Sequence, residues 1–219
     1  MTAISPSPRL VLADRVLPRG IVTDLALVAG GALFTALLAQ VTIPLVPVPI
    51  TGQTLAVLLV GATLGAWRGG AALGLYAVLG LAGLPFYAPE DDGSHVVGLA
   101  ALATSSFGYI LGFIPAAAIV GWLSERTWDR KFLKALATFV GGSLVVFAFG
   151  LPWLAGWLAI AGPAVWHDYM GYDTVLEATL GAGLYPFILG GLIKAVIAAL
   201  LLPAAWWGAN KLKANRDAD

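Results

Sequence analysis

One cation of the sequence lies deep within an apolar segment. Lys194 is nine residues from the start of segment 185–207 and thirteen from its end. At about 1.5 Å per helical residue its ammonium lies more than about 10 Å from either end, where an unpartnered charge in a membrane costs at least roughly 2.5 kcal/mol. No Asp or Glu occurs deep within an apolar segment to pair with it. We expect its partner to be an anionic ligand; snorkelling, or hydrogen bonds to backbone carbonyls at a broken helix, is the alternative.

Hydrogen-bonding and aromatic side chains lie at the ends of three other apolar segments, where they could surround such a ligand. They are Thr51 and Gln53 at the start of the second segment, Phe86 and Tyr87 after the third, and Ser105, Ser106, Phe107 and Tyr109 at the start of the fourth. Aromatic residues also concentrate at membrane interfaces without binding anything. Together, an apolar cavity with a few polar groups and one cation favours a small amphipathic acid with an apolar body.

The sequence lacks the combinations of residues that common catalytic sites need. His95 and His167 fall in loops, so Ser143 has no base for an intramembrane serine protease. There is no cysteine and no Gly-rich phosphate loop, and the acidic loop residues lack metal-ligand spacing. We expect no catalytic residue, no metal site and no cofactor. An intramembrane enzyme or an ion-coupled permease is the alternative from another class, although the latter usually has an acid deep in the membrane.

The composition excludes a water-soluble globule. Hydrophobic residues make up 59% of the 219 residues and charged residues only 11%, against about 25% charged in soluble proteins. Lys plus Arg and Asp plus Glu are both 12, so no charge surplus points to nucleic acid. Spans of about 20 residues allow about six helices and leave no room for an ATP-binding domain. The energy for any transport must then come from a partner or an ion.

Six apolar segments predict an all-α integral membrane protein with six transmembrane helices in residues 21–208. The segments are 21–43, 54–67, 69–84, 107–123, 132–151 and 185–207. Only Arg68 separates the second from the third, which predicts a tight helical hairpin. Residues 44–53, the Pro-rich loop, contain three prolines that cannot continue a helix. This loop is either a lid over the site or a rigid turn.

The two ends of the chain are predicted to be cytoplasmic. Residues 1–20 contain an apolar patch, 10–17, that Asp14 and Arg15 interrupt, so it is not a cleavable signal peptide and is expected to be a short amphipathic helix at the membrane surface. Residues 209–219 form a polar tail. With six crossings, eleven of the twelve cations fall on one side, which makes that side cytoplasmic. The acids of the opposite loops are expected to be solvated; they are Glu90, Asp91, Asp92, Asp168, Asp173 and Glu177.

Five blocks of the sequence resemble the BioY family, in order along residues 26–203. The blocks are PVPITGQTLAVLL at 47–59, GLAGLPF at 80–86, GYILGF at 108–113, FGLPW at 149–153 and PFILGGLIKA at 186–195. The first block is the most specific. BioY proteins are the biotin-binding S components of energy-coupling factor transporters.

The resemblance implies a six-helix S-component fold in a prokaryotic plasma membrane, in contact with membrane lipid. It implies an outward-facing biotin pocket that the first loop covers, lined by the third and fifth loops and the last helix. It also implies a T component and two ATPases as partners, with the S component toppling in the membrane to deliver its cargo. Ala32 and Ala36 form the AxxxA motif through which S components dock on the T component, although packing within the bundle explains this spacing equally well.

The sequence departs from the family near the expected site. The acid that usually follows Gly190 in the last helix is replaced by Gly191. The family's Gly-Pro-Thr-Gly-Gly-Tyr stretch is TSSFGY at 104–109, a small or amide-bearing segment has become PEDDG at 89–93, and the fifth loop, 155–184, is longer than usual. These departures leave an S component for another small anionic vitamin as the alternative ligand assignment.

Overall fold

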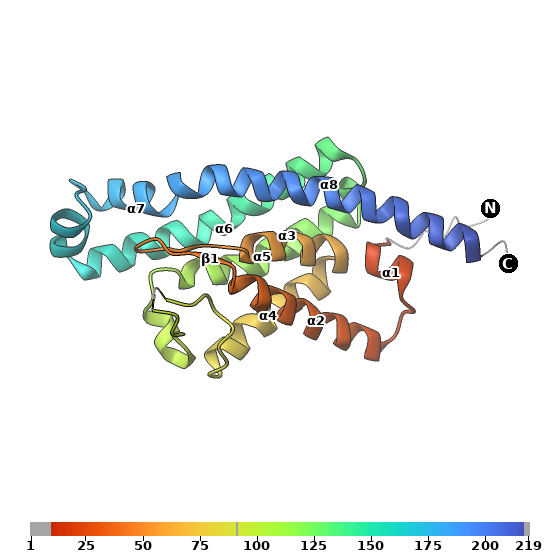
Figure 1. Cartoon of the computed structure of the whole chain (residues 1–219), viewed down its shortest axis with the longest axis horizontal. Helices are drawn as coiled ribbons and strands as arrows, with labels where there is room; N and C mark the ends of the chain where they lie inside the picture. The colour runs from red at the N-terminus through yellow and green to blue at the C-terminus, as the bar shows by residue number, and fades with distance from the viewer. Residues whose placement is uncertain (1–9, 91, 217–219) are drawn as a thin grey trace, which may run out of the picture.

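A computed structural model describes residues 10–90 and 92–216, so Arg9, Asp91 and residues 217–219 lie outside the described residues. Six main helices form at the six predicted segments. They are α2 (Ile21–Ala39), α3 (Gln53–Leu64), α4 (Ala66–Leu81), α5 (Phe107–Ser124), α6 (Phe132–Ala161) and α8 (Tyr185–Arg216). α6 and α8 run along the length of the molecule, with α5 packed between α6 and the α3–α4 pair (Figure 1). The prediction of an all-α fold is confirmed.

The tight hairpin predicted between the second and third segments is present. Only Gly65 separates α3 from α4, and its φ of 88° is a conformation that favours glycine. α5 packs directly on this corner, because a Cβ at Gly121 would lie 2.3 Å from the carbonyl carbon of Gly65. The backbones of three helices therefore meet without intervening side chains.

Residues 152–184 are more helical than predicted. α6 does not end at Leu151 but continues through Pro152 to Ala161, and Leu154 and Leu158 in this extension are fully buried. A π-helix, η3 (Ala164–Tyr169), and α7 (Val175–Gly183) follow where the sequence predicted a long loop. Thr174 caps α7 by accepting a hydrogen bond from the Glu177 backbone N–H at 3.1 Å. Burial of apolar side chains accompanies the extension of α6 beyond the predicted segment 132–151.

Four helical stretches in the described part of the chain are long and apolar enough to cross a membrane. They are Ile21–Ala39, Phe107–Ser124, Phe132–Ala161 and the combined stretch Val175–Lys211. α3 has 12 residues and α4 has 16, or roughly 18 and 24 Å at 1.5 Å per residue, against a hydrocarbon core of about 30 Å. Both are shorter than a complete span.

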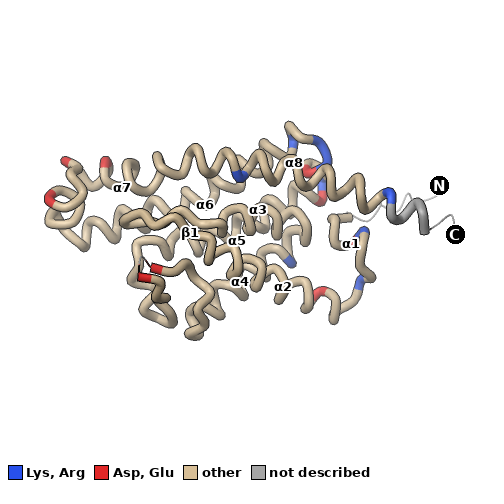
Figure 2. The backbone as a smooth tube through the Cα atoms, viewed as in Figure 1, with Lys and Arg blue, Asp and Glu red and all other residues tan. Residues whose placement is uncertain are grey.

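Charged residues divide between the two ends of the bundle. Figure 2 shows the described cations at the end that holds α1 (Leu12–Val16) and the last turns of α8, except one in the first half of α8. The sequence has one cation in that half of α8, Lys194. The other end carries acids and no cation among the described residues. The segregation predicted from the sequence is therefore present in three dimensions.

The amphipathic patch predicted near the start of the chain forms the helix α1, and its apolar side packs on the bundle. Val11 is 1% exposed and Ala13 is 7% exposed. Asp14 of α1 accepts a hydrogen bond from Arg68 Nη2 at 2.7 Å, while Arg68 Nη1 donates to Asp24 at 3.1 Å. Arg68 is itself buried, so its pairing with two carboxylates joins α1, α2 and α4 at this end.

The AxxxA motif of α2 faces the interior of the bundle. Ala32 is fully buried and Ala36 is 9% exposed, while Leu33 and Leu37 lie on the exposed side of the same helix. This face of α2 packs against α3 and α4. The structure therefore favours the packing explanation for the motif, and in this conformation neither alanine is available to a docking partner.

Replacing Ala32 by leucine tests this arrangement. The larger side chain has no space at the contact of α2 with α3 and α4, so Ala32→Leu should lower the free energy of unfolding by about 1–3 kcal/mol, measured as a lower melting temperature. Gly30→Leu is the matched control, because nothing lies within 4 Å of a Cβ there. An unchanged melting temperature combined with lost assembly with a partner would instead support the docking role.

Candidate functional site

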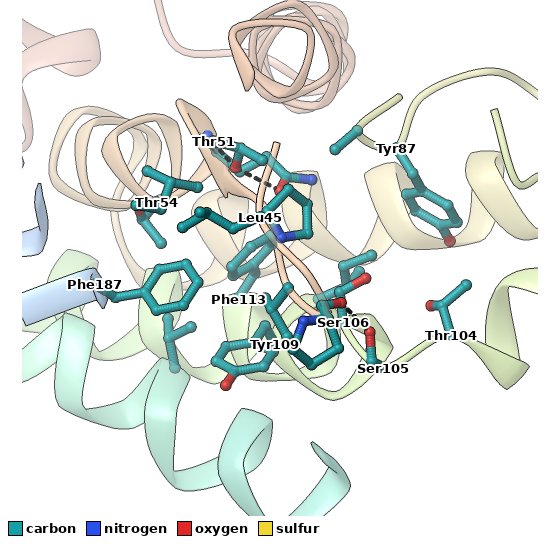
Figure 3. Close-up of a pocket in the computed structure, with 18 of the residues that line it drawn as sticks. Leu45, Thr51, Thr54, Tyr87, Thr104, Ser105, Ser106, Tyr109, Phe113 and Phe187 are labelled. Carbon is teal, nitrogen blue, oxygen red and sulfur yellow. Dashed lines mark hydrogen bonds between the residues drawn. The ribbon is translucent and has the colours of Figure 1, made fainter. Parts of the chain in front are cut away.

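A cavity of about 450 Å³ lies beside the N-terminal halves of α3, α5 and α8. Its walls come from the Pro-rich loop, the first turn of α3, the segment 87–106, α5, α6 and α8. Figure 3 shows Leu45 of the Pro-rich loop, Tyr109 and Phe113 of α5 and Phe187 of α8 around it. Its volume lies within the roughly 300–1,000 Å³ that is typical of small-molecule sites.

Lys194 is the one cation among the described lining residues. Its Nζ donates hydrogen bonds to the Thr51 backbone carbonyl at 2.5 Å and to Thr54 Oγ1 at 2.9 Å. The backbone-carbonyl alternative from the sequence is therefore realised in part. An ammonium has three N–H donors, so one donor remains for a ligand while both of these bonds persist.

The Pro-rich loop is held against the cavity by hydrogen bonds at its tip and at the end that enters α3. Strands β1 (Thr42–Ile43) and β2 (Ile50–Thr51) pair in an antiparallel hairpin that contains most of the loop. Ser105 Oγ donates to the Pro47 carbonyl at the tip, and Gln53 Nε2 donates to the Tyr76 hydroxyl at 2.5 Å. Thr51 Oγ1 donates to Gln53 Oε1 at 2.7 Å. The loop is thus an ordered wall of the cavity.

An aromatic cluster forms the wall on the side of α5, α6 and α8. The Tyr109 ring lies 6.3 Å from Phe187 and 6.2 Å from Phe147, centre to centre. The Tyr109 hydroxyl donates to the Gly183 carbonyl at 2.9 Å. Tyr109 therefore lines the cavity while its hydroxyl joins α5 to the end of α7.

Most of the ligand-site residues predicted from the sequence line the cavity. They are Thr51, Gln53, Tyr87, Ser105, Ser106, Tyr109, Gly191 and Lys194. Phe86 and Phe107 are outside its lining: Phe86 stacks on Tyr76, and Phe107 is buried between Tyr87 and Trp153. Phe107 thus contacts the lining residue Tyr87 from behind, and Phe86 packs on Tyr76, which accepts the hydrogen bond of the lining residue Gln53.

Gly191 leaves open space in the wall, since nothing lies within 4 Å of a Cβ built there. The lining residues that the sequence analysis missed are mainly apolar positions inside helices; they are Phe113, Val146, Phe147, Trp157 and Phe187. A sequence offers no signal that separates these positions from core or lipid-facing ones.

Among the described residues, no group of three His, Asp or Glu side chains could hold a metal ion. Burial raises the pKa of Tyr87 to about 12, and its hydroxyl donates to the Ala77 carbonyl at 2.6 Å. Tyr87 is therefore a neutral donor at physiological pH. The hydrogen bond to Asp168 raises the pKa of His167, which lies outside the cavity lining.

The BioY family profile matches residues 9–211 of the sequence. The chain belongs to the BioY family. A biotin transporter BioY from Rhizobium etli is 34% identical over 197 residues, which cover 87% of this chain and 95% of that protein. A biotin transporter BioY from Thermotoga maritima is also 34% identical, over 77% of this chain and 89% of that protein.

The fold is shared with a solved structure described as the S-component for biotin from an ECF-type ABC transporter. The TM-score is 0.54 at 23% identity, over 84% of this chain and 90% of that chain. Together with the long apolar helices, these matches establish a BioY membrane protein with the S-component fold. The apolar cavity beneath the Pro-rich loop is its candidate ligand site.

Removing the ammonium should loosen the Pro-rich loop even without ligand, because Lys194 joins α8 to the end of this loop. We expect Lys194→Met to increase the rate at which a maleimide labels a cysteine placed at Val46, which is 55% exposed. Lys211→Met, at the far end of α8, is the control and should not change the rate. Equal labelling of both variants would show that Thr51 and Thr54 are held without Lys194.

Proposed function

We propose that this BioY protein is the biotin-binding S component of an energy-coupling factor transporter and has no enzymatic activity of its own. The observation that carries the proposal is the position of Lys194, a single cation on the wall of an apolar cavity of ligand size. Its hydrogen-bond partners in the described protein are a carbonyl and a hydroxyl, both uncharged. A carboxylate from outside would supply the missing opposite charge.

Biotin combines the chemical features that such a cavity selects. Its carboxylate suits Lys194, and its apolar body suits the ring faces of Tyr109 and Phe187. Its ureido ring needs hydrogen-bond acceptors, and Glu90 is the one carboxylate among the described residues of the lining. The names of the relatives, biotin transporters at 34% identity, support the same ligand.

Gly191 favours a second candidate within the same class. A glycine stands where the family has an acid, and the space around it is open. An S component for another small anionic vitamin would keep the cation and dispense with that acceptor. Comparing biotin with other anionic vitamins in one binding assay separates the two ligands.

Transport requires partners that supply energy, because no phosphate-binding motif occurs in this sequence. As expected from the resemblance, these are a T component and two ATPases. The buried position of Ala32 and Ala36 means that docking on that face of α2 would need a rearrangement of the bundle. The exposed side of α2, with Leu33 and Leu37, needs none.

The proposed topology has six crossings of a prokaryotic plasma membrane, with residues 1–20 and 209–219 in the cytoplasm. The concentration of cations at the end with α1 supports this orientation. α3 and α4 are short, but each is continued at its outer end by ordered chain: the β-hairpin precedes α3, and residues 82–90 follow α4. Arg68 and the Gly65 corner would then lie at the cytoplasmic face.

Binding of biotin to the Lys194→Ala variant tests the charge pairing. The wild-type protein should prefer biotin to its uncharged methyl ester, and the variant should lose about 1.5–3 kcal/mol of biotin binding while binding the ester about as well as the wild-type protein does. Titration calorimetry on folded protein measures both ligands. A variant that still prefers the free acid would contradict the role of Lys194, and a wild-type protein that binds neither ligand would contradict the biotin assignment.

Single cysteines test the topology, because the sequence has none of its own. Ser94→Cys and Asp173→Cys should react with a membrane-impermeant maleimide in intact cells. Trp67→Cys, beside the Gly65 corner, and Lys211→Cys should react only after permeabilisation. All four positions are exposed. Labelling of Trp67→Cys in intact cells would show that α3 and α4 do not cross the membrane.

A further inference from the structure

The turn between α5 and α6 carries a concentration of positive charge that the ligand cavity does not use. Four cations lie within nine residues, around the 3-10 helix η2 (Trp128–Arg130). They are Arg126, Arg130, Lys131 and Lys134. Figure 2 shows this turn at the cationic end of the molecule.

Both acids of this turn accept hydrogen bonds from other parts of the protein. Glu125 Oε1 accepts a hydrogen bond from the Ala66 backbone N–H at 2.8 Å and so caps α4. Asp129 is fully buried, and its Oδ2 accepts from Trp206 Nε1 at 2.5 Å. The acids therefore bind inward, while Arg130, Lys131 and Lys134 remain exposed.

The four cations of the turn differ in their ion pairing from other cations at the same end. Arg68 and Arg19 form ion pairs with Asp14 or Asp24. No cation of the α5–α6 turn forms an ion pair within the described residues. The hydrogen bonds that the two arginines of this turn make go to the uncharged backbone carbonyls of Trp122 and Leu10.

Indole rings hold three of these cations beside apolar surface. Arg126 lies 3.6 Å from the centre of the Trp122 ring, Arg130 lies 4.1 Å from Trp206, and Lys134 lies 5.6 Å from Trp128. Exposed apolar side chains share this surface: Trp122 is 48% exposed, and Leu133 is 76% exposed. A ligand for this surface needs an anionic group and an apolar body attached to it.

We propose that the α5–α6 turn binds the headgroup of an anionic phospholipid. The phosphate would lie among Arg126, Lys131 and Lys134, and the acyl chains would cover Trp122 and Leu133. A free phosphate would use only the cations and an acidic peptide would leave the leucine uncovered, whereas a phospholipid uses both parts. The protein is a membrane protein, so phospholipids surround it.

Lipid titration of the purified full-length protein in detergent, followed by native mass spectrometry, tests the proposal. The probes are dioleoyl-phosphatidylglycerol, dioleoyl-phosphatidylcholine and glycerol 3-phosphate. The test variant carries Arg126→Gln, Lys131→Gln and Lys134→Gln, while Arg130 is kept because it stacks on the buried Trp206. The control variant carries Arg15→Gln, Arg19→Gln and Lys211→Gln, which remove the same charge at the same end of the molecule.

The wild-type protein and the control should bind phosphatidylglycerol in preference to phosphatidylcholine, and the test variant should bind it about tenfold to a hundredfold more weakly. Equal weakening in both variants would reduce the effect to net charge and overturn the proposal. Glycerol 3-phosphate bound as tightly as the lipid would identify a free-phosphate site instead. Unchanged lipid binding with lost assembly with partner subunits would identify a protein interface. Lys131→Glu, a single exposed change, repeats the test if the triple variant does not fold.

Discussion

The ammonium of Lys194 must be satisfied inside an apolar bundle, and much of the site's architecture follows from this constraint. No carboxylate of the described residues forms an ion pair with it, and it donates instead to the carbonyl of Thr51 and the hydroxyl of Thr54. Both acceptors lie where the Pro-rich loop enters α3, so the last helix is connected to the first outer loop across the bundle. Lys194 thus lines the candidate binding site and also holds the Pro-rich loop, which forms one wall of that site, by hydrogen bonds. A ligand that attracts the ammonium must act on the loop as well.

Close backbone contacts and aromatic rings together pack the helices around the cavity. At the closely packed cationic end, a Cβ at Gly61 would lie 2.5 Å from the Ala117 carbonyl oxygen of α5. Toward the other end α5 also lies close to α6, since a Cβ at Gly108 would lie 2.1 Å from a side-chain atom of α6. The rings of α5, α6 and α8 that pack against one another beside the cavity are Tyr109, Phe147 and Phe187. The Arg68 ion pairs close the packed end without using any residue of the cavity.

Sequence reasoning recovered what depends on local pattern. Apolar runs bounded by charge located all six main helices, and the depth of Lys194 in its run marked the site. It failed where tertiary burial decides the outcome: the predicted segment 132–151 stops short of a helix that continues to Ala161 with buried leucines. Phe107 belongs to the core and Phe187 to the cavity, although both are aromatic residues near the start of a helix. Only the positions of the neighbouring helices distinguish them.

The same rule of charge placement applies to the ligand cavity and to the α5–α6 turn. Where an acid is available, as for Arg68, the cation is neutralised within the protein and serves the fold. Where no acid of the described residues pairs with the cation, as for Lys194, or the acids are bound inward, as are Glu125 and Asp129, the cation remains available to an anion from outside the chain. Burial then decides which anion can reach it. The cavity limits Lys194 to a small molecule, whereas the exposed α5–α6 turn is open to a headgroup that the membrane itself provides.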